Sequence, residues 1–138
     1  MEVVLHLPVV PNVELVAAKA VETLGGALGM HQTHIEAASV AMVEACLNAM
    51  EHGGGPFTVR LRSDNQESRP CLVIEVEDHG EGFDPATAPK NSASRVHGST
   101  MKRGWGLTLI RELMDEVQIR SGPGMTQVSM RKYVERAP

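Results

Sequence analysis

Hydrophobic and polar residues are arranged along the chain in patterns that separate short strands from longer helices. Apolar clusters bounded by proline, glycine or polar stretches predict strands at residues 2–10, 57–62, 71–77, 117–121 and 126–133. Apolar residues that recur every three or four positions predict helices at residues 12–28, 33–51 and 104–117. This order of elements predicts an α+β sandwich, in which helices cover one face of a mostly antiparallel sheet.

Glycine, proline and polar residues mark the ends of the predicted elements. Asn12 is expected to cap the first helix and Gly29 to end it. The run Gly-Gly-Gly-Pro at 53–56 is expected to stop the second helix. The polar stretch 63–70 is expected to join two strands as a hairpin. Residues 79–103 show no sustained period, and loops of that length in compact domains are usually functional or disordered.

The composition is that of one globular domain, which we expect to span residues 1–138. The net charge is −4 and no Lys/Arg run reaches five residues, which argues against direct nucleic-acid or anionic-membrane binding. No apolar stretch is long enough to cross a bilayer, and the first residues lack the basic start of a signal peptide. We therefore expect a cytoplasmic protein. Cys46 and Cys71 lack metal-ligand spacing and are expected to pack as small core residues.

Polar residues on the second predicted helix form the first candidate site. Glu44, Asn48 and either Glu51 or His52 are spaced by three or four residues, so they share one side of that helix. A carboxylate can accept a proton from an attacking hydroxyl, and a carboxamide oxygen can bind Mg²⁺. The alternative is a solvated helix face, which the spacing alone does not exclude.

The end of the strand at 71–77 forms the second candidate site. Because side chains alternate across a strand, Asp78 falls in register with the apolar face and needs a hydrogen-bonding partner there. The amino group of an adenine would be such a partner. Gly80 and Gly82 follow at once and allow the backbone to approach a ligand closely. The alternative is a turn capped by an aspartate.

Two glycines at the start of the last predicted helix form the third candidate site. Gly104 and Gly106 would let backbone N–H groups approach phosphates at a helix N-terminus. Lys102 and Arg103 could neutralise phosphate charge, or they could be a solvated basic pair. The chain contains no G-x-x-x-x-G-K-[ST] motif, so a P-loop is excluded.

In this order and spacing, the three motifs resemble the ATPase/kinase superfamily of gyrase, histidine kinases and mismatch-repair ATPases. The N-box corresponds to residues 44–53, and the two glycine boxes correspond to 78–83 and 104–107. The stretches 106–117 and 124–130 are most similar to the short, stand-alone anti-sigma-factor serine/threonine kinases. The resemblance implies a Bergerat-type fold, a two-layer α/β sandwich with a mixed, mostly antiparallel sheet, and use of ATP and Mg²⁺.

The resemblance also implies a role for each matching residue. Glu44 would be the general base, and Asn48 would hold Mg²⁺. Asp78 would bind the adenine amino group. The remaining nucleotide-binding positions implied by the match, or by their place beside it, are His52, Gly80, Gly82, Lys102, Arg103, Gly104, Gly106, Leu107 and Thr126. Residues 84–103 would form a lid over the phosphates.

The expected function is therefore that of a bacterial serine/threonine-protein kinase that is also an anti-sigma factor. In the family, such a kinase sequesters an RNA polymerase sigma factor and phosphorylates an anti-sigma-factor antagonist of the STAS type. Homodimerisation is typical of the family. The alternative is a non-catalytic module that docks on a partner only when it holds ATP or ADP.

Overall fold

A computed structural model describes residues 1–80 and 98–134 of the chain, with residues 98–105 described in their backbone alone. The strands are β1 (Glu2–Leu7), β2 (Phe57–Gln66), β3 (Arg69–Asp78), β4 (Glu116–Gly122) and β5 (Met125–Tyr133). The helices are α1 (Val13–Ala27), α2 (Gln32–His52) and α4 (Gly98–Leu113). The five strands form one sheet in the order β1-β2-β3-β5-β4, and each described pairing is antiparallel.

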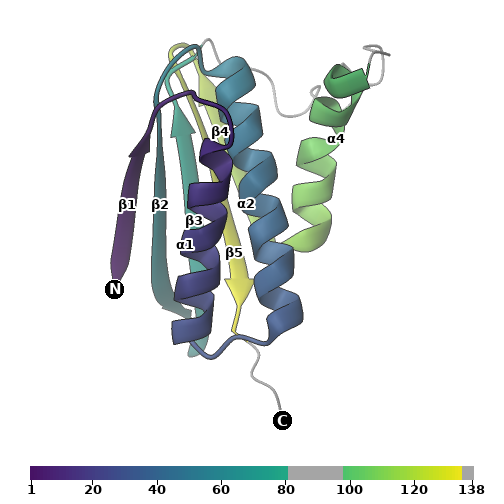
Figure 1. Ribbon diagram of the computed structural model, residues 1–138. Helices are drawn as coiled ribbons and strands as arrows, with labels where there is room; N and C mark the ends of the chain where they lie inside the picture. The colour runs from purple at the N-terminus through teal and green to yellow at the C-terminus, as the bar shows by residue number, and fades with distance from the viewer. Residues whose placement is uncertain (81–97, 135–138) are drawn as a thin grey trace.

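The described helices lie together on one face of this sheet, with α2 between α1 and α4 (Figure 1). This arrangement confirms the predicted α+β sandwich. Apolar side chains on the inner faces of the two layers make one hydrophobic core. On α2 they follow the helical period, as shown by Ile35, Ala38, Met42, Ala45 and Ala49. The helical period of α2 therefore determines which of its side chains pack against the sheet and which lie outside the core.

Both cysteines are buried, as predicted. Cys46 on α2 lies in the hydrophobic core, and Cys71 on β3 is buried on the opposite face of the sheet. Burial, together with the charge of Glu14, raises the pKa of the Cys46 thiol to about 12. A thiol with this pKa is protonated and unreactive at neutral pH.

The β2–β3 hairpin is longer than predicted, because polar residues expected in its loop belong to the strands. Only Glu67 and Ser68 remain in the turn, and both have a positive φ, 49° and 68°. Two consecutive positive-φ residues match the twist of an antiparallel pair, so a two-residue turn suffices. The prediction that residues 63–70 form the connection was therefore wrong.

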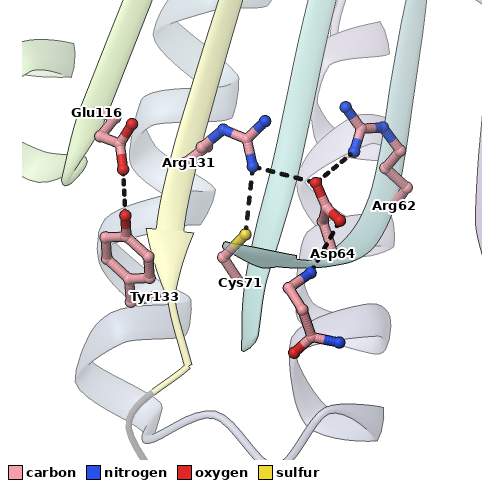
Figure 2. Close-up of polar contacts among 7 residues, drawn as sticks. Arg62, Asp64, Cys71, Glu116, Arg131 and Tyr133 are labelled. Atoms are coloured by element: carbon pink, nitrogen blue, oxygen red, sulfur yellow. Dashed lines mark hydrogen bonds and ion pairs between the residues drawn. The ribbon is translucent and has the colours of Figure 1, made fainter. Parts of the chain in front are cut away.

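Polar contacts hold the sheet together at this hairpin end, on the face that carries no helix (Figure 2). Asp64 on β2 accepts hydrogen bonds of 3.2 Å from Arg62 and from Arg131 on β5. The hydroxyl of Tyr133 on β5 donates to Glu116 on β4. The ion pair between β2 and β5 and the hydrogen bond between β5 and β4 favour strand over loop for these polar residues.

The last helix begins earlier than predicted. Residues 98–103, expected to belong to a long loop, form the first part of α4, and Gly104 and Gly106 lie inside the helix. Glycine lowers intrinsic helix propensity by about 1 kcal/mol, so the sequence placed the start of the helix at the glycines. Packing of α4 against α2 outweighs that cost. At its other end, Lys132 on β5 donates a hydrogen bond of 2.7 Å to the carbonyl of Leu113.

The α1 boundaries are close to those predicted, but the predicted cap is different. Asn12 occupies the position before α1 with φ 70°, and its side chain makes no capping hydrogen bond. Gly29 ends the helix in the left-handed region, with φ 75°. Glycine adopts this conformation without strain, which is why a helix commonly stops there.

Candidate functional site

A row of polar side chains crosses the inner face of the sheet at one end, where the neighbouring rows are apolar. Asp78 on β3 is the register partner of Thr126 on β5, and Thr126 is the register partner of Ser121 on β4. The hydroxyls of Ser121 and Thr126 are 2.8 Å apart. Asp78 is 5% exposed and Thr126 is 3% exposed, so both are nearly enclosed by protein. Two predicted adenine-site residues are thus side by side.

The buried carboxylate of Asp78 has a perturbed acidity. Burial raises its pKa above the ordinary value of an aspartate, while a hydrogen bond from Gly80 and the nearby His52 and His79 oppose the rise. The Gly80 N–H donates to Oδ1 at 3.0 Å. The other carboxylate oxygen, Oδ2, can then accept a hydrogen bond from a donor such as the exocyclic amino group of a base.

Two glycines bring the end of α2 against the end of β3. A Cβ placed on Gly53 would lie 2.8 Å from the Cβ of Asp78, and 2.4 Å from the carbonyl oxygen of Ala49. A Cβ placed on Gly80 would lie 2.1 Å from the carbonyl oxygen of His52. Only glycine fits at these contacts. The junction therefore brings the last turn of α2 next to the carboxylate of Asp78.

Helix α2 carries the remaining predicted residues of this region. Glu44 is 8% exposed, and Asn48 is half-buried one turn further along. His52 is the exposed last residue of the helix, close enough to Asp78 to affect its pKa. The carboxylate of Glu44 is therefore nearly enclosed by protein, one helical turn from the carboxamide of Asn48.

The second predicted glycine box lies against this part of α2. A Cβ placed on Gly106 in α4 would lie 3.2 Å from Oε2 of Glu44, so the glycine lets the α4 backbone approach the carboxylate. The next residue, Leu107, is 5% exposed and packs in the hydrophobic core. Any contact of Leu107 with a ligand would thus use its backbone. Because α4 begins at Gly98, the expected helix N-terminus at Gly104 was wrong.

The remaining predicted positions are described less fully. Lys102, Arg103 and Gly104 have helical backbone in α4, and their side chains lie outside the described part of the structure. Gly82 and residues 84–97 of the expected lid lie outside the described residues. Sequence reasoning missed Gly53 and Ser121. Gly53 was visible as a helix terminator and as the last residue of the N-box, without a role of its own, and Ser121 was visible only as the end of a predicted strand.

The described residues fit a nucleotide better than a metal alone. The Gly53–Gly80 junction packs the end of α2 closely against β3, next to a buried hydrogen-bond acceptor, Asp78, that suits the amino group of a base. Within residues 1–80 and 98–134, no three His, Cys, Asp or Glu side chains gather as a metal site. A Mg²⁺ ion here would need oxygen ligands from Asn48 and from phosphates, which is how this ion is commonly held. No helix in the described residues is long and apolar enough to cross a membrane.

Comparison with known proteins identifies the same family as the three sequence motifs. The family model described as the histidine kinase-like ATPase domain matches residues 10–132. The chain is 33% identical over 117 residues to the serine-protein kinase RsbW of Bacillus licheniformis, covering 79% of this chain and 71% of that protein. It is 30% identical over 102 residues to the anti-sigma F factor of Caldanaerobacter subterraneus subsp. tengcongensis, covering 72% and 68%.

A solved structure shares the fold. A chain in the crystal structure of the SiaB–SiaC complex from Pseudomonas aeruginosa superimposes with a TM-score of 0.62 at 14% identity, over 96% of this chain and 89% of that chain. At this identity the likeness concerns the fold alone. Together with the sequence relatives, it confirms the resemblance inferred from the three motifs.

Proposed function

Because the chain belongs to the histidine kinase-like ATPase family, and within it to the anti-sigma-factor serine/threonine kinases, we propose that it is an ATP-dependent serine/threonine-protein kinase. The observation that carries this proposal is the position of Glu44. Its carboxylate is 8% exposed, lies against the Gly106 backbone of α4, and is one helical turn from Asn48. A domain that only binds nucleotide has no need of a buried carboxylate there.

Each residue has a distinct task in the proposed reaction. Bound ATP would supply the phosphoryl group and leave as ADP, and Mg²⁺ would neutralise the negative charge of the phosphates. Asp78 would orient the adenine by accepting a hydrogen bond from its amino group, and Thr126 lies beside Asp78 on the neighbouring strand. The carboxamide oxygen of Asn48 would hold the Mg²⁺ ion. The carboxylate of Glu44 takes the proton from the serine or threonine hydroxyl of the protein substrate. Phosphoryl transfer depends mainly on such positioning and charge neutralisation.

The proposed partners follow from the names of the relatives. One is called a serine-protein kinase and another an anti-sigma F factor. We therefore propose that this protein sequesters an RNA polymerase sigma factor, and phosphorylates a STAS-type antagonist that competes for it. We further propose that it acts as a homodimer in the cytoplasm.

Phosphotransfer from γ-labelled ATP to STAS-domain proteins of the same genome tests the proposal. Glu44→Gln should keep ATP affinity and slow transfer by about 10²- to 10⁴-fold, the usual contribution of a general base. Glu36→Gln is a matched control, because Glu36 is an exposed glutamate on the same helix. If Glu44→Gln transfers phosphate as fast as the control, Glu44 is not the base. If ATP binds and no STAS protein is labelled, a nucleotide-dependent docking module becomes the better account.

A further inference from the structure

Strand β4 forms one edge of the sheet and pairs with β5 alone. Hydrogen bonds of a strand inside an antiparallel sheet alternate between its two neighbours. The N–H of Val134, just after β5, donates to the carbonyl of Pro70 on β3 at 2.8 Å. The carbonyl of Arg131 instead accepts from the N–H of Asp115, just before β4, at 3.0 Å. Even-numbered residues of β5 therefore bond to β3, and odd-numbered residues bond to β4.

This alternation determines which backbone groups of β4 are open. Gln118 is the register partner of Ser129, an odd-numbered residue of β5, so the backbone groups of Gln118 bond to β5. The N–H and C=O groups of Val117 and Ile119 therefore point away from the sheet. Within residues 1–80 and 98–134, no other strand pairs with this edge. A row of open backbone groups of this kind can accept a further strand.

The side chains of β4 run from acidic to basic on one face of the sheet and are apolar on the other. Glu116, Gln118 and Arg120 are exposed on the face that carries no helix. Among the described residues, the side chain of Arg120 has no ion-pair or hydrogen-bonding partner. Val117 and Ile119 lie on the inner face and are half-buried against the core. A complementary antiparallel strand would therefore run from an acidic to a basic residue, with apolar residues at the intervening positions.

A polar hollow beside Glu116 can accept the basic side chain of such a strand. Glu116 and Arg131 are register partners, yet their side chains turn apart (Figure 2). Glu116 accepts a hydrogen bond from Tyr133, whereas Arg131 is neutralised by Asp64. The hollow between them has a volume of about 510 Å³ and is lined by Glu116, Val117, Gln118, Ser129 and Arg131. Its carboxylate, amide and hydroxyl oxygens are acceptors that suit an ammonium group.

We propose that β4 binds an extended segment of a partner protein, which adds to the edge of the sheet as a further strand. The segment is antiparallel to β4, like each described pairing in this sheet. It carries an acidic residue opposite Arg120, a basic residue opposite Glu116, and apolar residues opposite Val117 and Ile119. Backbone hydrogen bonds supply the affinity, and the two charges select the sequence and its direction. This docking does not depend on kinase activity.

Titration of the full chain with the peptide acetyl-Asp-Val-Thr-Val-Lys-amide, followed in amide NMR spectra, tests the docking. The amide signals of Val117 and Ile119 should shift most, because their N–H groups gain acceptors. N-methylation of both peptide valines removes the donors that face β4 and should abolish these shifts. Absent shifts, shifts confined to other strands, or equal binding of the methylated peptide would overturn strand addition at β4. Shifts that depend on protein concentration alone would mean that a second copy occupies this edge instead.

A charge exchange tests the register. Arg120→Glu should bind the same peptide about three- to tenfold more weakly, because an attraction between exposed charges becomes a repulsion. The peptide acetyl-Lys-Val-Thr-Val-Lys-amide should reverse this order and bind Arg120→Glu more tightly than the wild type. Lys19→Glu is the matched control, since it makes the same change of charge at an exposed residue of α1 and should leave both affinities unchanged. If the wild type and Arg120→Glu bind each peptide alike, the proposed register is wrong.

Discussion

The contact between Gly53 and Asp78 gives a prediction whose size follows from the geometry. In Gly53→Ala, the added Cβ would lie 2.8 Å from the Cβ of Asp78 and 2.4 Å from the carbonyl oxygen of Ala49. Ordinary contact between carbon atoms begins near 3.5 Å, so Asp78 must move by about 0.7 Å. Crowding of this kind costs about 1–3 kcal/mol of folding free energy.

This cost converts into a measurable shift in melting temperature. The unfolding entropy is about 2.1 cal/mol/K per residue, or about 0.29 kcal/mol/K for a chain of 138 residues. A loss of about 1–3 kcal/mol then lowers the Tm of Gly53→Ala by roughly 3–10 °C. A shift of about 0.7 Å also lengthens any hydrogen bond that Asp78 accepts beyond good geometry. We therefore expect ATP and ADP to bind about tenfold or more weakly in calorimetric titration.

Gly55→Ala is the control, because it makes the same change two residues away. A Cβ placed on Gly55 has no heavy atom within 4 Å, and its φ is outside the left-handed region. Its Tm and its nucleotide affinity should match those of the wild type closely. If Gly53→Ala behaves like Gly55→Ala in both measurements, the junction does not position Asp78. If only the Tm of Gly53→Ala falls, the junction is structural and Asp78 does not bind adenine.

Four further predictions follow from the site and the core. Asp78→Asn should weaken adenine nucleotide binding in calorimetry, whereas unchanged affinity would refute the adenine assignment. Burial raises the pKa of Asp78 in the folded protein, so the ionised carboxylate destabilises the fold above that pKa. Below about pH 4 the carboxyl is protonated in both the folded and the unfolded protein, so this destabilisation disappears. Without nucleotide, the Tm of Asp78→Asn at pH 7 should therefore equal or exceed that of the wild type, and any such difference in Tm should vanish in acid. A lower Tm at pH 7 would contradict this reasoning. Ser121→Ala removes a hydrogen-bonding partner of the Thr126 hydroxyl and should weaken nucleotide binding by about three- to tenfold. An unaltered affinity would show that Thr126 needs no orientation from Ser121. Cys46, with its thiol pKa of about 12, should resist thiol reagents at pH 8 until the protein is unfolded, and rapid labelling of the native protein would contradict its burial.

Periodicity in the sequence was enough to place most of the elements and one side of the site. Glu44 and Asn48 share a side of α2 because the helical period requires it, and Asp78 points inward because strand side chains alternate. The order of the elements also indicated the α+β sandwich. These features depend on neighbours in sequence, which a single chain reveals directly.

The features that sequence reasoning missed depend on contacts between distant segments. The start of α4 was misplaced because its glycines disfavour a helix locally, whereas packing against α2 supports one. The approach of Gly53 to Asp78 joins two elements separated by the whole of β2. Likewise, Ser121 gains its importance only when β4 pairs beside β5 in register. Only the folded arrangement brings such residues together.

Placing Glu44 and Asn48 on one helix has a consequence for how this protein can evolve. Their separation along the axis is about 6 Å, which is set by the rise of the helix and by nothing else in the chain. Substitutions in other segments can alter which protein is held near the nucleotide, but they leave this spacing unchanged while α2 stays folded. In the proposed kinase, partner choice and reaction chemistry can therefore change independently, so a gene duplicate could acquire a new partner and keep the same chemistry.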